Sequence, residues 1–97
     1  MKYIYKIVRN YADGTMETLK YGITGKGPNS KGVLPRPNSQ LKSGVDANGR
    51  EFTDSYDQVA SAKNRADALA TEQKLVNDYA KVNKGKAPPD NARPQPK

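Results

Sequence analysis

The first part of the chain alternates apolar and polar positions in the manner of a β-hairpin. Residues 2–8 are rich in β-branched and aromatic side chains, and residues 17–24 have the composition of a returning strand. Between them, the Asp13-Gly14 pair is typical of a tight hairpin turn. Gly22 inside the second strand marks either a bulge or a place where another group approaches the backbone closely.

The middle of the chain has a weaker pattern. Residues 36–42 predict a short helix with Pro37 at its first position and Gly44 near its end. Phe52 and then residues 56–62 predict a third strand. Because the alternation in this strand is poor, we expect it at an edge of the sheet.

A longer helix follows and carries the clearest helical signals. Asn64 is a suitable N-cap residue, and Asp67 three positions later forms a partial capping box. We expect the helix to run to about Val82 and to end by Gly85. Residues 83–97 contain four prolines and four Lys or Arg residues, which is typical of an extended basic tail.

These elements predict an α+β fold in the order β-β-α-β-α, with a small three-stranded antiparallel sheet flanked by helices. With 97 residues, the chain is long enough for one small domain and not for two. We expect the domain to span residues 1–82 and the basic, Pro-rich segment 83–97 to close it. No apolar run reaches the roughly 18 residues that a membrane-spanning helix needs. The abrupt start, without a signal peptide, suggests a domain cut from a longer protein.

One acidic residue, Glu72, is out of place on the long helix. A carboxylate within an apolar stripe must be neutralised, paired or bound to a metal ion. The alternative is a side chain that reaches solvent at the edge of the stripe or pairs with a nearby Lys or Arg. The residues that share its face at helical spacing are Ala68, Leu69, Leu75, Val76 and Tyr79.

Composition narrows the chemistry that this chain can perform. It contains no histidine and no cysteine, which excludes Ser-His and Cys-His catalysis, thiolate chemistry and imidazole zinc sites. Proton transfer must then use a tyrosine, a lysine or a carboxylate. The formal net charge of +7 favours a polyanionic partner such as nucleic acid, and an acidic protein would also suit it.

Five features in order along the chain resemble the GIY-YIG nuclease family. They are Tyr3-Ile4-Tyr5, Tyr21-Gly22-Ile23, Arg36, Glu72 and Asn91. The first tripeptide has Tyr3 where the family has glycine, and the second is scrambled. Matching by residue type puts Tyr21 in the place of the family's second tyrosine, whereas matching on Gly22 puts Lys20 there. Because neighbours on a strand face opposite sides, we expect only one of the two to enter the site.

The resemblance implies a metal-dependent endonuclease that hydrolyses the phosphodiester bonds of nucleic acid. We favour DNA over RNA as the substrate, although the sequence itself does not distinguish the two. Glu72 would bind one Mg²⁺ or Mn²⁺, and Arg36 would clamp the phosphate. Tyr5 or Tyr21 would take a proton from water, and Asn91 would orient either the glutamate or a backbone turn. We expect three further lysines to contact nucleic acid: Lys26, Lys31 and Lys42.

Each of these residues also has a structural interpretation. Tyr5 and Tyr21 could be ordinary cross-strand aromatics, Arg36 a solvated surface residue and Asn91 a turn residue. Two other functions remain open for the whole chain. It could be a non-catalytic nucleic-acid-binding module, or an interaction domain whose basic surface meets an acidic protein.

A finer resemblance is to the nuclease toxin domains at the C-termini of large bacterial polymorphic toxins. It lies in residues 20–24, 36–41, 64–70 and 85–89. It implies delivery into competing bacteria as part of a larger secreted toxin, action in the cytoplasm of the target cell, and a cognate immunity protein, which we expect to be acidic.

Overall fold

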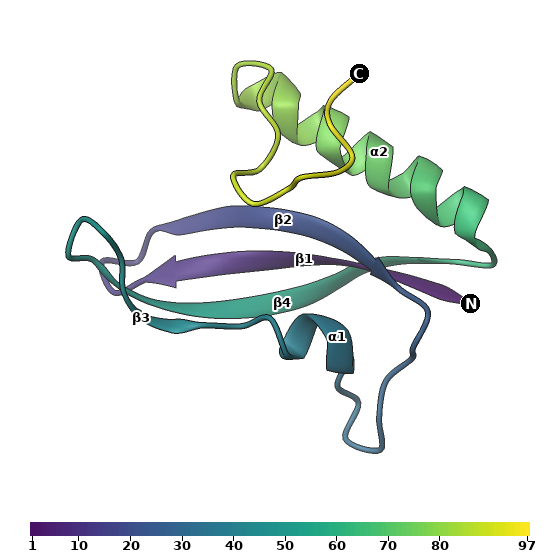
Figure 1. The fold of residues 1–97 in the computed structure, drawn as a ribbon, viewed down its shortest axis with the longest axis horizontal. Helices are drawn as coiled ribbons and strands as arrows, with labels where there is room; N and C mark the ends of the chain where they lie inside the picture. Colours follow the sequence, from purple (N-terminus) through teal and green to yellow (C-terminus); the bar gives the residue numbers. More distant parts are fainter.

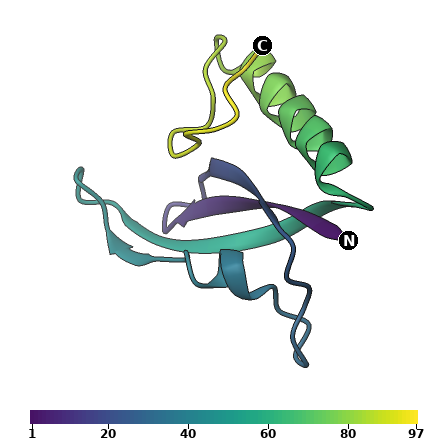
Figure 2. The same cartoon turned by 45° about the vertical axis from the view of Figure 1, so that its right-hand side comes forward.

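The N-terminal hairpin forms one side of a four-stranded antiparallel sheet with the strand order β2-β1-β4-β3 (Figure 1). The computed structural model describes all 97 residues. Helix α2 covers one face of the sheet, and α1 lies against the other (Figures 1 and 2). The α+β class is therefore confirmed. The elements are β1 (Lys2–Tyr11), β2 (Met16–Thr24), α1 (Pro35–Asn38), β3 (Ser43–Val45), β4 (Glu51–Ala62) and α2 (Arg65–Val82).

The predicted hairpin is confirmed, and its turn is held by Asp13. The Asp13 carboxylate accepts hydrogen bonds from the Thr15 backbone N–H at 2.9 Å and from the Thr15 hydroxyl at 2.6 Å. Gly14 has φ +90°, a conformation that glycine adopts without the steric cost of a side chain. Strand pairing then runs from Asn10 opposite Met16 to the far end of the hairpin, with one register shift along the way.

The third predicted strand, β4, is internal, so the edge position expected for it is wrong. It pairs with β1 along its whole length and with β3 at its start. Its alternation is poor because most of its side chains are exposed, and only Asp54 is buried. Hydrogen bonds to two neighbouring strands, rather than burial of side chains, place β4 inside the sheet.

The fourth strand, β3, was not predicted, and α1 is shorter than expected. All three β3 residues are exposed, so no apolar pattern marks them. Helix α1 is a single turn that starts at Pro35 rather than Pro37. The chain leaves the helix early because the Lys42 carbonyl accepts a hydrogen bond from the Asp54 backbone N–H at 2.8 Å, which draws it to the sheet. Gly44 therefore lies in β3 instead of ending a helix.

Helix α2 has the predicted bounds and cap. The Asn64 side chain accepts a hydrogen bond from the Asp67 backbone N–H at 2.9 Å, which satisfies one of the free donors of the first turn. Its buried face is narrower than predicted, because Leu69 is 44% exposed. The buried residues recur every fourth position: Ala68, Glu72, Val76 and Ala80. No helix of the molecule is long and apolar enough to span a membrane.

The two faces of the sheet have separate apolar contacts. Tyr5 and Ile7 point to the face that carries α1, where they cluster with Leu19 and pack against Leu41 and Tyr56. The Tyr56 hydroxyl also accepts a hydrogen bond from a backbone N–H of the segment before α1, which holds that segment against the sheet. Strand alternation points the intervening buried side chains of β1 to the opposite face, beneath α2.

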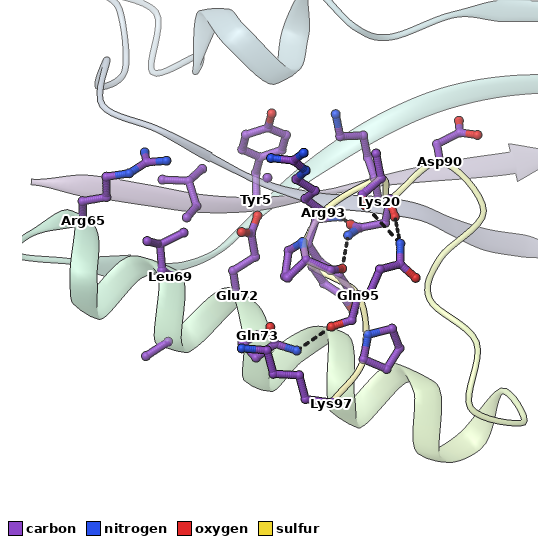
Figure 3. Close-up of a pocket in the computed structure, with 18 of the residues that line it drawn as sticks. Tyr5, Lys20, Arg65, Leu69, Glu72, Gln73, Asp90, Arg93, Gln95 and Lys97 are labelled. Atoms are coloured by element: carbon purple, nitrogen blue, oxygen red, sulfur yellow. Dashed lines mark hydrogen bonds between the residues drawn. The ribbon is translucent and has the colours of Figure 1, made fainter.

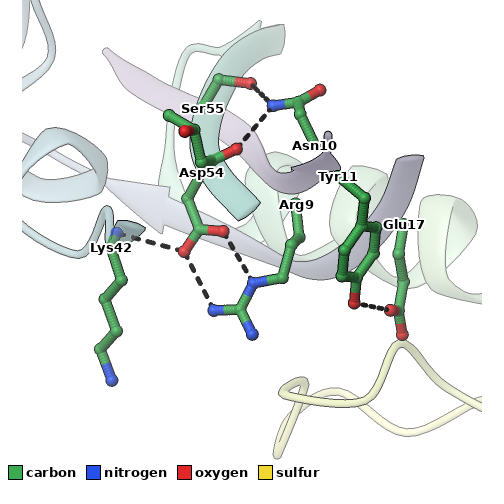
Figure 4. A network of polar contacts seen from close by, with 8 residues as sticks. Arg9, Asn10, Tyr11, Glu17, Lys42, Asp54 and Ser55 are labelled. Carbon is green, nitrogen blue, oxygen red and sulfur yellow. Dashed lines mark hydrogen bonds and ion pairs between the residues drawn. The ribbon is translucent and has the colours of Figure 1, made fainter. Parts of the chain in front are cut away.

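A buried ion pair joins β1, β4 and the segment after α1 (Figure 4). The Arg9 guanidinium donates two hydrogen bonds to the Asp54 carboxylate, at 2.9 and 3.2 Å. The same carboxylate accepts from the Lys42 backbone N–H at 3.1 Å. The guanidinium also stacks 3.7 Å from the centre of the Phe52 ring. This network fixes the side of the sheet that is remote from α2.

Residues 83–97 fold back over the β2 edge (Figure 2). The Asp90 backbone N–H donates to the Leu19 carbonyl at 2.8 Å, and the Asn91 side chain accepts from the Tyr21 backbone N–H at 2.7 Å. Backbone groups of β2 that would otherwise form a free sheet edge are thus paired. The segment lies between β2 and α2.

Candidate functional site

A groove of about 1230 Å³ lies where α2, the β2 edge and the C-terminal segment meet (Figure 3). It extends around β2, so that residues from both faces of the sheet reach it. All six residues that the resemblance assigns to catalysis line this one groove: Tyr5, Lys20, Tyr21, Arg36, Glu72 and Asn91.

Glu72 is a buried residue whose carboxylate has no hydrogen-bond or ion-pair partner in the protein. The residue is 6% exposed, and its side chain leaves α2 toward the sheet (Figure 3). It makes no hydrogen bond, and no ion pair of the molecule includes it. Burial raises the pKa of Glu72 above its ordinary value, and the positive charges of Arg65 and Lys20 oppose that shift. Glu72 therefore has no salt bridge, and its carboxylate opens into the groove.

Tyr5 reaches the groove because Gly22 has no side chain. The two residues are paired across β1 and β2, and the Tyr5 ring lies over the glycine. A Cβ atom at position 22 would be 2.5 Å from the Tyr5 hydroxyl oxygen, well inside van der Waals contact. Tyr5 is 1% exposed and also belongs to the apolar cluster beside α1. It is thus both a core residue and part of the groove wall.

Lys20 and Tyr21 point to opposite faces of the sheet, yet both line the groove. Lys20 pairs with Ile7 and shares the face of Tyr5, whereas Tyr21 pairs with Lys6 and faces α2. Burial raises the pKa of Tyr21, and negative charge on α2 adds to that shift. They reach the groove from opposite faces of the sheet because it surrounds the edge strand, and which of them takes the place of the family's second tyrosine stays open.

Asn91 orients a backbone turn and not the glutamate. It is 4% exposed, accepts a hydrogen bond from the Tyr21 backbone N–H at 2.7 Å, and donates one to the Pro94 carbonyl at 2.9 Å. The oxygen and the nitrogen of the Asn91 side-chain amide are therefore both hydrogen-bonded to backbone groups. Of the two roles expected for it, the geometry fits the positioning of the turn.

The predicted basic residues divide into two groups. Arg36 lies on α1, is exposed and lines the groove. Lys26, Lys31 and Lys42 are exposed as well, but none of them lines it. Lys26 and Lys31 lie on the long loop before α1, and the structure does not bring these three lysines together with the other predicted residues.

Three further cationic side chains line the groove and were not predicted: Arg65, Arg93 and Lys97. Arg65 is seven residues before Glu72 on α2, two turns away on the same face, so helical spacing could have indicated it. Nothing local in the sequence indicates Arg93 or Lys97, because the fold of the C-terminal segment brings them there. Together with Lys20 and Arg36 they give the groove five cations against two acids, Glu72 and Asp90. None of the five cations takes part in an ion pair.

The acidic groups limit which metal ion this groove could bind. The molecule contains no group of three or more His, Cys, Asp or Glu side chains able to hold a metal. Zn²⁺ and Ca²⁺ usually need several protein ligands. Mg²⁺ and Mn²⁺ can be bound by a single carboxylate together with water and a substrate phosphate. A buried, unpartnered Glu72 fits that last arrangement.

Comparison with known proteins supplies no relative for this chain. No protein-family model, no curated protein and no solved structure matches it. The function is therefore inferred from the side chains of the groove and from their chemistry.

Proposed function

We propose that this protein is a metal-dependent endonuclease that hydrolyses phosphodiester bonds of nucleic acid, DNA in preference to RNA. The observation that carries this proposal is the unpartnered carboxylate of Glu72, a largely buried residue that opens into a mainly cationic groove. A carboxylate in such a place costs stability unless it has a ligand. A divalent cation that also contacts a phosphate would supply one.

The side chains that line the groove together with Glu72 suit a phosphate group. Glu72 would hold the Mg²⁺ or Mn²⁺, and the ion, when bound, supplies Lewis-acid stabilisation of charge on the phosphoryl oxygens. Arg36 and Lys20 reach the groove from two different elements and carry no competing salt bridge. They would bind the non-bridging phosphate oxygens, for which the planar guanidinium of arginine is well shaped.

Hydrolysis needs a base for the attacking water, and Tyr5 suits this role better than Tyr21. The water oxygen bonds to phosphorus as the ester P–O bond breaks; Tyr5, as phenolate, takes the water proton, and the leaving oxygen takes a proton from solvent. Lys20, which would bind the phosphate, lies on the same face of the sheet as Tyr5. The raised pKa of Tyr21 makes its phenolate harder to form.

A plasmid-cleavage assay tests the proposal. Supercoiled plasmid is incubated at low salt with Mg²⁺, with and without a chelator, and with the wild type, Glu72→Gln and Tyr5→Phe. We expect chelator-sensitive nicking by the wild type, none by Glu72→Gln, and a rate about 10²- to 10⁴-fold lower for Tyr5→Phe. Circular dichroism checks the fold of each variant. Unchanged nicking by Glu72→Gln would reject the proposal.

The cationic groove also supports a second candidate, a nucleic-acid-binding module without catalysis. Five unpaired cations would bind phosphates whether or not Glu72 holds a metal. In that case the wild type would bind nucleic acid without cutting it, and Glu72→Gln would bind at least as well. A domain that recognises only an acidic protein would show no nucleic-acid affinity near physiological salt.

We also propose a biological setting, which the resemblance to bacterial toxin domains supports. The domain would be delivered into competing bacteria as part of a larger secreted protein and would act in their cytoplasm. A cognate, acidic immunity protein would cover the basic groove. Induced expression in a bacterium tests the toxic activity: the wild type should stop growth, and Glu72→Gln should not.

A further inference from the structure

We propose that Arg93 is a substrate-binding residue whose guanidinium contacts a phosphate of the nucleic-acid backbone in the groove. This inference rests on the proposed function, because it names a contact to the same substrate. Arg93 belongs to the C-terminal segment, in a turn that the fold holds in place.

The turn that carries Arg93 is closed by side chains on both sides of it. The Asn91 side chain donates to the Pro94 carbonyl at 2.9 Å, across Ala92 and Arg93. The Gln95 side chain donates back to the carbonyls of Asn91 and Ala92, both at 3.0 Å. Polar side chains that would be free in a flexible tail are thus used to fix the conformation of four residues.

The same turn is tied to the sheet and to α2. The Tyr21 backbone N–H donates to the Asn91 side chain at 2.7 Å, and the Gln73 side chain donates to the Gln95 carbonyl at 2.8 Å. A ligand that binds Arg93 therefore does not have to order the backbone that carries it. Such pre-organisation saves part of the entropy cost of binding.

The Arg93 side chain itself has no role in holding the turn. It makes no hydrogen bond and no ion pair, and it lines the groove. Figure 3 shows it extending from the C-terminal turn toward the sheet, between Glu72 and Lys20 in that view. An arginine held in position by its backbone, with all its donors free, is arranged for an external planar acceptor.

A phosphate of nucleic acid is the acceptor that the groove favours. Five cationic side chains surround the groove, from α1, α2, β2 and the C-terminal segment. A single small anion cannot use all of these, whereas a chain of phosphates can. Arg65 on α2 and Arg93 on the C-terminal segment then contact different phosphates along the bound strand.

The test measures binding and not cleavage, so that it is independent of catalysis. Glu72→Gln serves as the parent, and a short fluorescein-labelled DNA duplex is titrated at NaCl concentrations between about 50 and 200 mM. Arg93→Gln and Arg93→Lys are added to this parent, with Lys84→Gln as the control. Lys84 is exposed and does not line the groove.

We expect Arg93→Gln to weaken binding and to reduce the slope of log K against log salt by about 1, the value for one phosphate contact. Arg93→Lys should keep the slope and lose part of the affinity, because lysine lacks the planar fork. Lys84→Gln should change neither. Because the Arg93 side chain makes no hydrogen bond and no ion pair within the protein, the melting temperature of the Arg93 variants should equal that of their parent.

The outcomes separate this inference from the proposed function. If Arg93→Gln matches its parent in affinity and slope, the inference is overturned, even where wild-type protein cuts plasmid. If the wild type fails to cut but Arg93→Gln still lowers the slope, the nuclease proposal fails and the phosphate contact stands.

Discussion

At the scale of single residues, Gly22 and Tyr5 fit closely against each other in the groove wall. The sequence marks Gly22 as a place of close approach, and the structure identifies the approaching group as the ring of Tyr5 on the neighbouring strand. The position of the proposed base therefore depends on the absence of a side chain on another strand.

Gly22→Ala should displace the Tyr5 ring. The added methyl group would stand 2.5 Å from the Tyr5 hydroxyl oxygen, and the backbone of both strands is fixed by pairing. We expect a loss of about 1–3 kcal/mol in the free energy of unfolding, measured by urea denaturation, together with slower plasmid nicking. The control is Gly25→Ala, whose methyl group would meet only the flexible end of the Lys2 side chain. Equal effects of the two substitutions would contradict this explanation.

Glu72→Gln should raise stability at neutral pH. Burial raises the Glu72 pKa, so between its ordinary value of 4.5 and the raised value the folded state binds more protons than the unfolded state. The contribution of Glu72 to the free energy of unfolding is therefore fully present below about pH 4.5, and it is lost as the pH rises through the raised pKa. Neutral glutamine avoids that loss.

Melting curves from about pH 4 to 8 check this sign. Glu72→Gln should melt above the wild type at pH 7, and the difference should shrink toward the acidic end. Added Mg²⁺ should raise the melting temperature of the wild type only. A glutamine variant that melts lower at pH 7 would show that Glu72 is stabilised by a partner in the free protein.

Residue identity in the groove was only partly predictable. The family resemblance names six residues that the fold brings to one groove, from five different parts of the chain. It misses Arg65, Arg93 and Lys97, and the three lysines expected to contact nucleic acid lie outside the groove. A residue type and a charge can be read from the sequence, but which exposed cations share a groove depends on tertiary contacts.

At the scale of elements, the Arg9–Asp54 pair holds the sheet to the segment after α1 (Figure 4). The Asp54 side chain is 1% exposed and accepts three hydrogen bonds, two from Arg9 and one from the Lys42 backbone. Arg9→Leu would remove the cation and leave a buried carboxylate with one donor.

We expect Arg9→Leu to cost about 3–5 kcal/mol in the free energy of unfolding, because it strands a buried charge. The double substitution Arg9→Leu with Asp54→Leu should recover much of that loss, since apolar pairs often replace buried ion pairs at little cost. Urea denaturation of the two single variants and the double variant gives the coupling energy. Additive losses would show that the pair is not coupled.

Elements with strong local signals were predicted, and those without were not. The hairpin has an Asp-Gly turn and alternating strands, and α2 has an N-cap and a helical period. All three residues of β3 are exposed, so the apolar pattern does not indicate this strand. Most side chains of β4 are exposed as well, so the pattern does not indicate its internal position in the sheet. Backbone pairing between distant segments decides both, and it leaves little trace in local sequence.

At the scale of the whole molecule, charge should dominate nucleic-acid binding. The chain carries a formal net charge of +7, and five of its cations line the groove. If all five neutralise duplex phosphates, log K should fall against log salt with a slope of about −4.5. Affinity would then drop about 500-fold between 50 and 200 mM salt. Fluorescence anisotropy with labelled DNA measures this slope, and a slope near zero would exclude the groove as a polyanion site.

The groove takes one wall from residue 5 and another from residues 90–97, the two extremes of the chain. The C-terminal segment buries little beyond Pro88 and Asn91, and it is tied to the sheet and to α2 by hydrogen bonds of Asp90, Asn91, Gln95 and Lys97. Detaching it costs less free energy than dismantling the sheet. On gentle warming, residues 83–97 should therefore detach first. The protein would then lose affinity for a substrate while its circular dichroism spectrum still shows native strands.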